Sequence, residues 1–169
     1  MIFQEPIVPH PEIAARIGNR VSTLRMMILN PPDGPFVHRI ALRIPVGDNM
    51  VDNFRSGKSG NLLGRVDHDS GRVVGVFSGV GPNWRSVAAH PDTGGSLEGW
   101  TLPCWTETSK IVLDAATAFP GFRIQGWDVA ITPNGPTFVE LNHRGDFDLL
   151  QQAEGRGVAD QTFLRALRA

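Results

Sequence analysis

Alternating apolar and polar positions in the first half of the chain predict short β-strands. The clearest pattern covers residues 36–45, where one predicted face carries Phe36, His38, Ile40, Leu42 and Ile44 and the other carries Val37, Arg39, Ala41 and Arg43. Because one face is apolar, we expect an antiparallel strand buried on one side, with its two arginines on a wet or ligand-binding side. Related patterns predict strands over residues 1–7, 22–30, 62–66, 72–77, 122–132 and 137–142.

Helical periodicity belongs mainly to the second half of the chain. The best example, over residues 107–119, places Ile111, Val112, Ala115, Ala116 and Phe119 on one stripe. Shorter helices are predicted over residues 11–17, 146–153 and 160–167, and residues 78–103 are predicted to form a long irregular segment. We therefore expect an α+β fold, an antiparallel β-sheet flanked by helices, forming a single domain over residues 1–169.

The amino-acid composition argues against nucleic-acid and membrane partners. The 16 basic and 17 acidic residues give a net charge of -1, so the chain lacks the basic excess typical of nucleic-acid binders. No apolar run approaches the roughly 18 residues of a membrane span, which argues against a membrane partner. Cys104 is the only cysteine, and the N-terminal residues lack the layout of a signal peptide. We therefore expect a cytoplasmic protein.

The most informative segment is the hairpin predicted over residues 126–142. Residues 133–135, Pro-Asn-Gly, suit a three-residue hairpin loop closed by glycine in a left-handed conformation. With that loop, Asp128 lies opposite Glu140, and Asn142 follows two residues later on the same face. A two-residue Asn-Gly loop would instead place Asp128 on the face opposite Glu140.

Two carboxylates and an amide at cross-strand spacing can bind metal cations. Cβ atoms of paired residues lie about 5 Å apart, so these side chains can converge on one or two hard cations. Magnesium prefers such oxygen ligands and keeps room for phosphate oxygens and water. A solvated hairpin face with incidental acidic residues is the alternative, and the pattern by itself leaves both open.

The pairing of Asp128 with Glu140-x-Asn142 resembles the magnesium site of the ATP-grasp superfamily. Residues 3–7 look like the hinge strand that holds adenine through its backbone, and residues 22–25 look like the strand that opens the C-terminal lobe. The chain as a whole, over roughly residues 3–151, therefore resembles an ATP-grasp C-terminal lobe.

Further motifs indicate a branch of this superfamily. Arg43, with the loop segments 52–54 and 57–60 that follow it, is similar to the arginine and the Asn/Gly-rich loop of glutamate-ligase-like members. Residues 90–105, which begin with His-Pro-Asp-Thr-Gly-Gly, resemble the branch called sugar-transfer-associated ATP-grasp, related to alpha-L-glutamate ligases.

This resemblance implies an ATP- and Mg²⁺-dependent ligase that joins a carboxylate to an amine through an acyl phosphate. The implied metal ligands are Asp128, Glu140 and Asn142, with Mn²⁺ able to replace Mg²⁺. Arg43 would be the catalytic residue, stabilising charge on the transferring phosphoryl group. The implied partners are ATP and a small carboxylate or amine substrate. The implied ATP-binding residues are Gln4, Glu5, Ile7, Arg25, Arg43 and Asn53.

Two features depart from the ATP-grasp pattern. The lysines that grip ATP in ATP-grasp enzymes precede the hinge strand, whereas the lysines of this chain are Lys58 and Lys110. Gly126 occupies the position, two residues before the metal-binding aspartate, where the superfamily usually has an arginine. We therefore expect a lobe without its N-terminal lysine-bearing part, poorly active by itself, that pairs with a missing lobe or forms a homodimer through residues 1–7.

Two other functions remain open at this stage. The chain could be a non-catalytic nucleotide-binding or partner-pairing module, or an ATP-grasp kinase that uses the same site on a hydroxyl acceptor.

Overall fold

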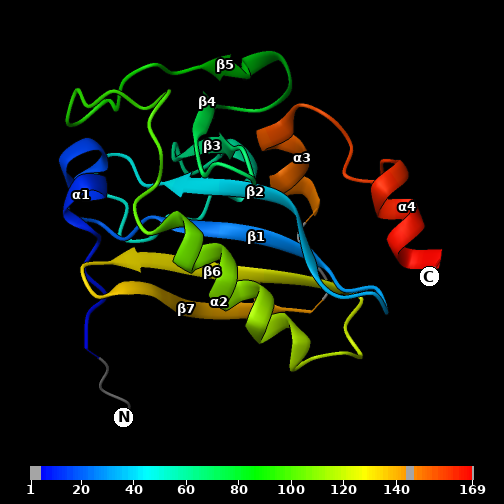
Figure 1. Cartoon of the computed structure of the whole chain (residues 1–169). Helices are drawn as coiled ribbons and strands as arrows, with labels where there is room; N and C mark the ends of the chain where they lie inside the picture. The colour runs from blue at the N-terminus through cyan, green and yellow to red at the C-terminus, as the bar shows by residue number, and fades with distance from the viewer. Residues whose placement is uncertain (1–4, 144–146, 169) are drawn as a thin grey trace, which may run out of the picture.

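The computed structural model describes residues 5–143 and 147–168. Within these ranges a seven-stranded antiparallel sheet is accompanied by four α-helices, which confirms the predicted α+β fold class (Figure 1). Across the sheet the strands follow the order β5-β4-β3-β2-β1-β6-β7. Their bounds are β1 Thr23–Leu29, β2 Phe36–Ile44, β3 Leu62–Val66, β4 Val73–Ser78, β5 Arg85–Ser86, β6 Ile124–Thr132 and β7 Gly135–Asn142.

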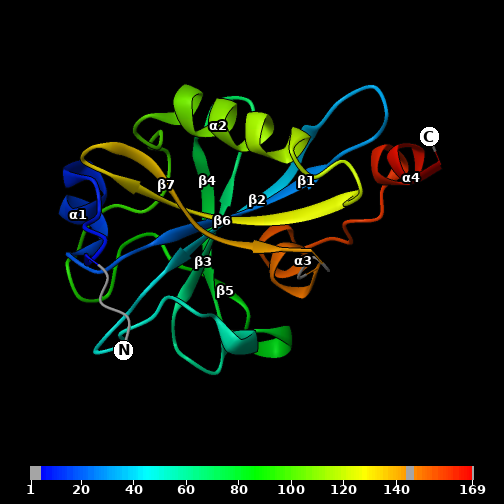
Figure 2. The same ribbon diagram turned by 90° about the horizontal axis from the view of Figure 1, so that it is seen from below.

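The helices cover both faces of this sheet. Figure 2 shows α2 above the sheet and α3 beneath it, and we call these two sides the α2 face and the α3 face. The helix bounds are α1 Pro11–Ile17, α2 Trp105–Thr117, α3 Phe147–Glu154 and α4 Gln161–Arg168. No helix in the described ranges is long and apolar enough to cross a membrane.

Each face carries its own hydrophobic core. Leu24, Met26 and Ile28 of β1 pack on the α2 face, in a cluster that also takes in residues of α1 and α2. Met27 and Leu29 of the same strand pack on the α3 face, against residues of α3 and α4. Because both faces are covered, β1 is buried along its whole length and reads as a nearly continuous apolar run.

Strand β2 differs from its prediction in two respects. Both of its faces are covered, so Arg39 and Arg43 are only 8% and 6% exposed, which excludes the wet face but leaves the ligand-binding face that was also predicted. A bulge also interrupts its pairing with β1, because Met27 pairs with Arg39 while Ile28 pairs with Val37, which leaves His38 as the extra residue. Residues before the bulge therefore change face. Val37 packs against the α2-face core and Phe36 against the α3-face core.

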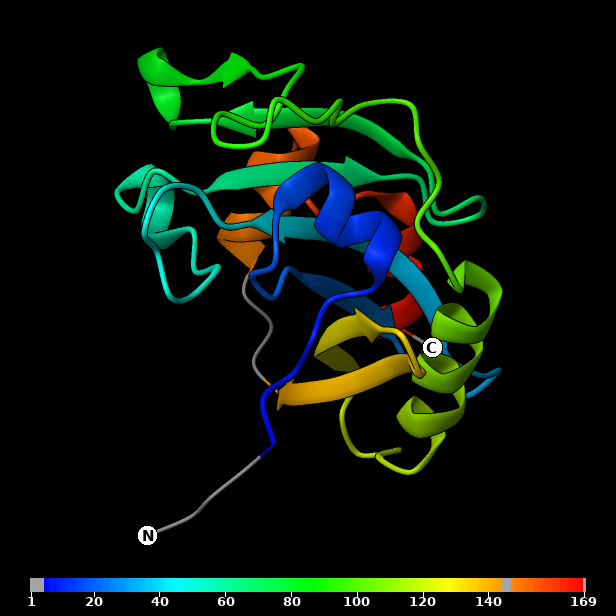
Figure 3. The ribbon, with the colours of Figure 1, turned by 90° about the vertical axis from the view of Figure 1, so that its left-hand side faces the viewer.

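The N-terminal segment also differs from its prediction. Residues 5–10 adopt no strand, so the predicted strand over 1–7 is wrong for its described part. Figure 3 shows this segment running past the turn between β6 and β7 before α1 begins. The backbone N–H of His10 donates to the carbonyl of Ile131 at 2.8 Å, and this bond fixes the entry to α1.

Candidate active site

A polar cluster interrupts the apolar lining of the α3 face. It consists of Thr23 and Arg25 from β1, Arg43 from β2 and Asp128 from β6, all 6% exposed or less. Arg25 and Asp128 are direct cross-strand partners, and β1 lies between β2 and β6 in the sheet. Since side chains alternate along a strand, the sheet itself projects this set to one side.

Asp128 is the centre of the cluster. Its Oδ1 accepts a hydrogen bond from Arg25 Nε at 2.5 Å, and its Oδ2 accepts from Arg25 Nη2 at 3.2 Å and from Arg43 Nη2 at 2.7 Å. An ionised carboxylate offers about four acceptor positions. The two arginines use three of them, which leaves one position on Oδ1.

Arg43 links Asp128 to the loop that follows β2. Its Nε donates to Thr23 Oγ1 at 2.8 Å, and its Nη1 donates to Asn53 Oδ1 at 3.3 Å. Asp52, the residue before Asn53, lies 3.5 Å from Arg43 Nε and accepts from the backbone N–H of Thr23 at 2.8 Å. The structure thus brings the predicted residues Arg25, Arg43 and Asn53 into one network.

Burial dominates the electrostatics of Asp52. It raises the pKa of this carboxyl above its ordinary value, against the opposing effects of Arg43 and of the hydrogen bonds from Thr23. Nearby Asp128 raises the same pKa further, because two like charges share one site. The loop between β2 and β3 is therefore tied to the cluster by a carboxyl that ionises less readily than a solvated one.

The β6–β7 hairpin has the predicted pairing of Asp128 with Glu140, but its loop differs from the prediction. Thr132 pairs with Gly135, so the loop has two residues and the predicted three-residue loop is wrong. A bulge between Asp128 and Val129 adds one residue to β7 and restores the register. The predicted pairing of Asp128 with Glu140 is therefore confirmed.

Glu140 and Asn142 lie on the edge strand beside this cluster. Glu140 is exposed, whereas Asn142 is partly buried and pairs with Gly126. The Nδ2 of Asn142 is buried and has no hydrogen-bond partner in the described part of the chain. A buried amide in this state has capacity for a ligand or for a water molecule.

The predicted ligands for Mg²⁺ are two carboxylates and one amide. No group of three or more His, Cys, Asp and Glu side chains able to hold a metal occurs in residues 5–143 and 147–168, so the predicted site depends on Asn142 for its third protein ligand. Glu140 is open to solvent, and Asp128 retains one acceptor position. The unsatisfied atom of Asn142 is the donor Nδ2, so a metal would use the oxygen of this amide instead. Magnesium is usually held by one or two carboxylates together with phosphate oxygens, which this set matches.

The predicted adenine-binding residues lie elsewhere. Gln4 falls outside the described residues. Glu5 and Ile7 line a cavity of about 560 Å³ together with residues of the β6–β7 turn, including Thr132 and Thr137. Thr132 is four residues along β6 from Asp128, a distance of about 13 Å. The structure therefore places Glu5 and Ile7 apart from the Arg43 cluster.

Two members of the network were missed as site residues by the sequence reasoning. Thr23 shares the side-chain alternation of Arg25, so its place on the same face was available from the strand pattern. Asp52 lies in an irregular loop, and nothing in its local sequence indicates that it approaches β1.

Comparison with protein families identifies the family of the chain. The model of the sugar-transfer-associated ATP-grasp family matches residues 1–166 of the chain. The chain belongs to this family. Comparison with curated proteins gave no match. Membership of the ATP-grasp family implies ATP-dependent ligase-type activity in general, and proteins of this family typically bind ATP together with Mg²⁺.

Proposed function

We propose that this ATP-grasp chain is the catalytic lobe of an ATP- and Mg²⁺-dependent carboxylate–amine ligase. The observation that carries the proposal is the buried cluster of Arg25, Arg43 and Asp128, with Glu140 paired to Asp128 at its edge. Burying these charges has a desolvation cost, and packed apolar side chains in their place would often be as stable, so the cluster supports a functional role.

In this reaction the cluster would bind the phosphate groups of ATP. The terminal phosphoryl group of ATP is transferred to the substrate carboxylate, and the amine then displaces phosphate from the acyl phosphate. Arg43 would stabilise charge on the transferring group, and Asn53 would orient Arg43 through its side-chain oxygen. Asp128 would orient both guanidinium groups by accepting their hydrogen bonds.

Asp128, Glu140 and Asn142 would hold Mg²⁺ on the phosphates. The ion would neutralise the developing charge on the phosphate oxygens. Since the arginines already occupy three acceptor positions of Asp128, we expect Mg²⁺ to bind weakly until nucleotide phosphates complete its coordination.

The same observation supports a second candidate function. A carboxylate that accepts hydrogen bonds from two arginines already has its charge paired without any ligand. The chain would then be a non-catalytic nucleotide-binding module in which Asp128 only positions the arginines.

Binding experiments test the metal site. We expect Mg²⁺ with a non-hydrolysable ATP analogue, at ten times its dissociation constant, to stabilise the fold by about 1.4 kcal/mol, which raises the melting temperature by several degrees. Glu140→Gln should remove the Mg²⁺-dependent part of this shift. Glu98→Gln, which changes another exposed glutamate on the segment before α2, is the matched control and should leave the shift intact. Equal shifts in all three proteins would remove Glu140 from the site.

Trapping with hydroxylamine tests the reaction. Acyl phosphates react with hydroxylamine to give hydroxamates, so ATP-dependent hydroxamate formation from a panel of carboxylic acids is the expected result for a ligase. Nucleotide binding with no hydroxamate and no ADP formation would favour the non-catalytic module.

A further inference from the structure

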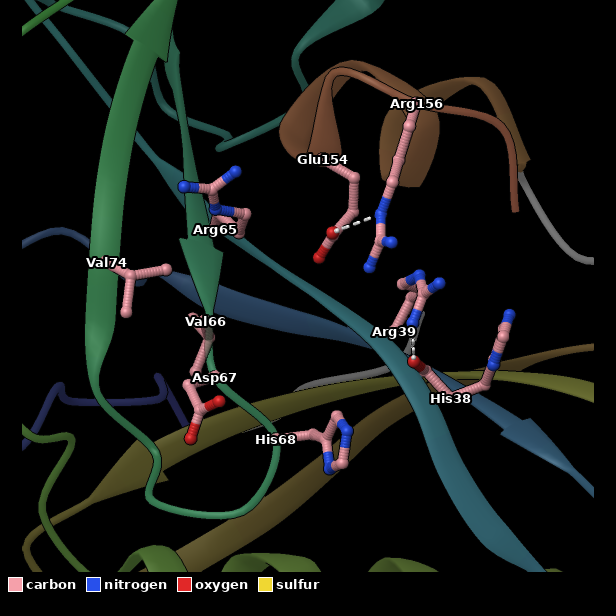
Figure 4. A pocket seen from close by; sticks show the side chains of 9 residues that line it. All are labelled: His38, Arg39, Arg65, Val66, Asp67, His68, Val74, Glu154 and Arg156. Carbon is pink, nitrogen blue, oxygen red and sulfur yellow. Dashed lines mark hydrogen bonds and ion pairs between the residues drawn. The ribbon is translucent and has the colours of Figure 1, made fainter. Parts of the chain in front are cut away.

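A second polar cavity lies on the α3 face. It is next to His38 and Arg39 of β2, whereas Arg43 lies near the C-terminal end of that strand. It has a volume of about 350 Å³ and is lined by residues of β2, β3, β4 and the end of α3 (Figure 4). This volume is at the lower end of the range for small-molecule sites. Figure 4 draws Arg65 on one side of the cavity and Arg39 and Arg156 on the other.

Arg39 is the buried member of this set. It is 8% exposed, and it pairs with Asp160 and donates to the carbonyl of His38 at 2.9 Å. Its Nε is buried and has no hydrogen-bond partner among the described residues. An unsatisfied donor on a buried cation is costly, so the position favours a ligand that accepts this bond.

Arg65 and Arg156 supply further donors. Arg65 is half-buried, and its only described interaction is with the ring of Phe77, 6.0 Å from the guanidinium carbon. Arg156 lies 3.4 Å from Glu154 through Nε. Among the described residues, Arg39 and Arg156 therefore each have an acidic partner, whereas Arg65 has none.

The acidic residues that line the cavity are already engaged. Asp67 accepts hydrogen bonds from the backbone N–H and the hydroxyl of Ser70, at 2.9 and 2.5 Å, within the β3–β4 turn. Glu154 is the partner of Arg156. Neither acid pairs with Arg65, so Arg65 remains available for an anion from solution.

From this geometry we propose that the cavity binds an oxyanion, the carboxylate or phosphate group of a small molecule, through Arg65 and the Nε of Arg39. Guanidinium groups match both anions because their N–H groups can donate two parallel bonds. Arg39 and Arg43 are four residues apart on β2, about 13 Å, so this site is separate from the proposed phosphate site. The proposal does not depend on the ligase assignment.

Nuclear magnetic resonance of the arginine Nε–H groups tests the proposal. Inorganic phosphate and glutarate are titrated separately at constant ionic strength set with chloride, and the signals of Arg39 and Arg65 are followed. A saturable shift of both signals is expected with at least one anion. Tighter binding of phosphate would identify a phosphorylated ligand, and tighter binding of glutarate would identify a carboxylate.

Variants of Arg65 separate a specific site from general attraction. Arg65→Gln should weaken binding at Arg39 at least tenfold. Arg65→Lys keeps the charge and the stem but loses the paired donors, so it should weaken binding at least threefold. Arg85→Gln, which changes an exposed arginine on β5, is the matched control and should bind as the wild type does. No saturable shift with either anion, or unchanged binding in both Arg65 variants, would overturn the proposal.

Discussion

At the scale of single residues, Asp128 is the carboxylate that both buried arginines of the polar cluster share. It is 2% exposed and receives hydrogen bonds from Arg25 and Arg43, while Glu140 opposite it is exposed. The two carboxylates of the predicted metal site therefore have different structural roles. Asp128 holds buried cations in place, and Glu140 is free to meet a ligand.

This difference predicts unequal costs of substitution. Asp128→Asn leaves Arg25 and Arg43 buried without the carboxylate they share, and we expect the free energy of unfolding to fall by about 3–5 kcal/mol. Glu140→Gln is the control, and it should change this free energy by less than about 0.5 kcal/mol because the side chain is exposed. Urea denaturation measures both. Similar small effects in the two variants would show that the arginines do not depend on Asp128.

At the scale of elements, glycine determines how the β3–β4 turn packs. Gly71 has a φ of +69°, and a Cβ added there would lie 2.3 Å from Cγ of Trp105, the first residue of α2. The carbonyl of Gly71 also accepts a hydrogen bond from the N–H of Leu102 at 3.0 Å. The turn therefore rests directly against the start of the helix that covers the α2 face.

A pair of glycine substitutions isolates this contact. Gly94 has nearly the same φ, +71°, but no atom lies within 4 Å of its added Cβ. Both alanine variants should lose stability from the unfavourable backbone conformation, by roughly 1–2 kcal/mol. Gly71→Ala should lose a further 1–3 kcal/mol or so, because the turn must move away from Trp105. Thermal denaturation of the two variants gives the difference, and equal losses would contradict the close approach.

At the scale of the whole molecule, two cores share one sheet. Trp100, Trp105 and Trp127 belong to the α2-face core, and Trp84 is 42% exposed, so tryptophan fluorescence reports mainly on that face. Phe163 of α4 packs in the core of the opposite face. Since β1 contributes residues to both cores, neither core can form fully without the strand that supports the other.

We therefore predict a single cooperative transition. Phe163→Ala should lower the free energy of unfolding by about 3–5 kcal/mol, the usual cost of removing a buried phenylalanine side chain. The midpoint should fall equally by tryptophan fluorescence and by far-ultraviolet circular dichroism, although the tryptophans lie on the other face. A fluorescence midpoint that stays at the wild-type value would mean that the two cores unfold separately.

Local sequence was sufficient for much of this architecture. Alternation along residues 36–45 predicted a strand, and helical periodicity over residues 107–119 predicted most of α2, because both depend on side-chain spacing alone. The position of the β6–β7 turn was also predictable from residues 133–135, but the pairing of Asp128 with Glu140 results from a two-residue loop and a bulge that the sequence did not indicate. The family resemblance rested on the same local motifs.

Contacts between distant segments settled the rest. Arg39 was expected on a wet face, but α3 and α4 cover that face, and Asp160 pairs with Arg39 from 121 residues away. The bulges at His38 and between Asp128 and Val129 arise where each strand must fit its neighbour, so local alternation does not reveal them. Asp52 joins the Arg43 cluster through the path of a loop. The alternation of side chains along a strand depends only on the local sequence. Burial and bulges depend on which distant segments pack against that strand.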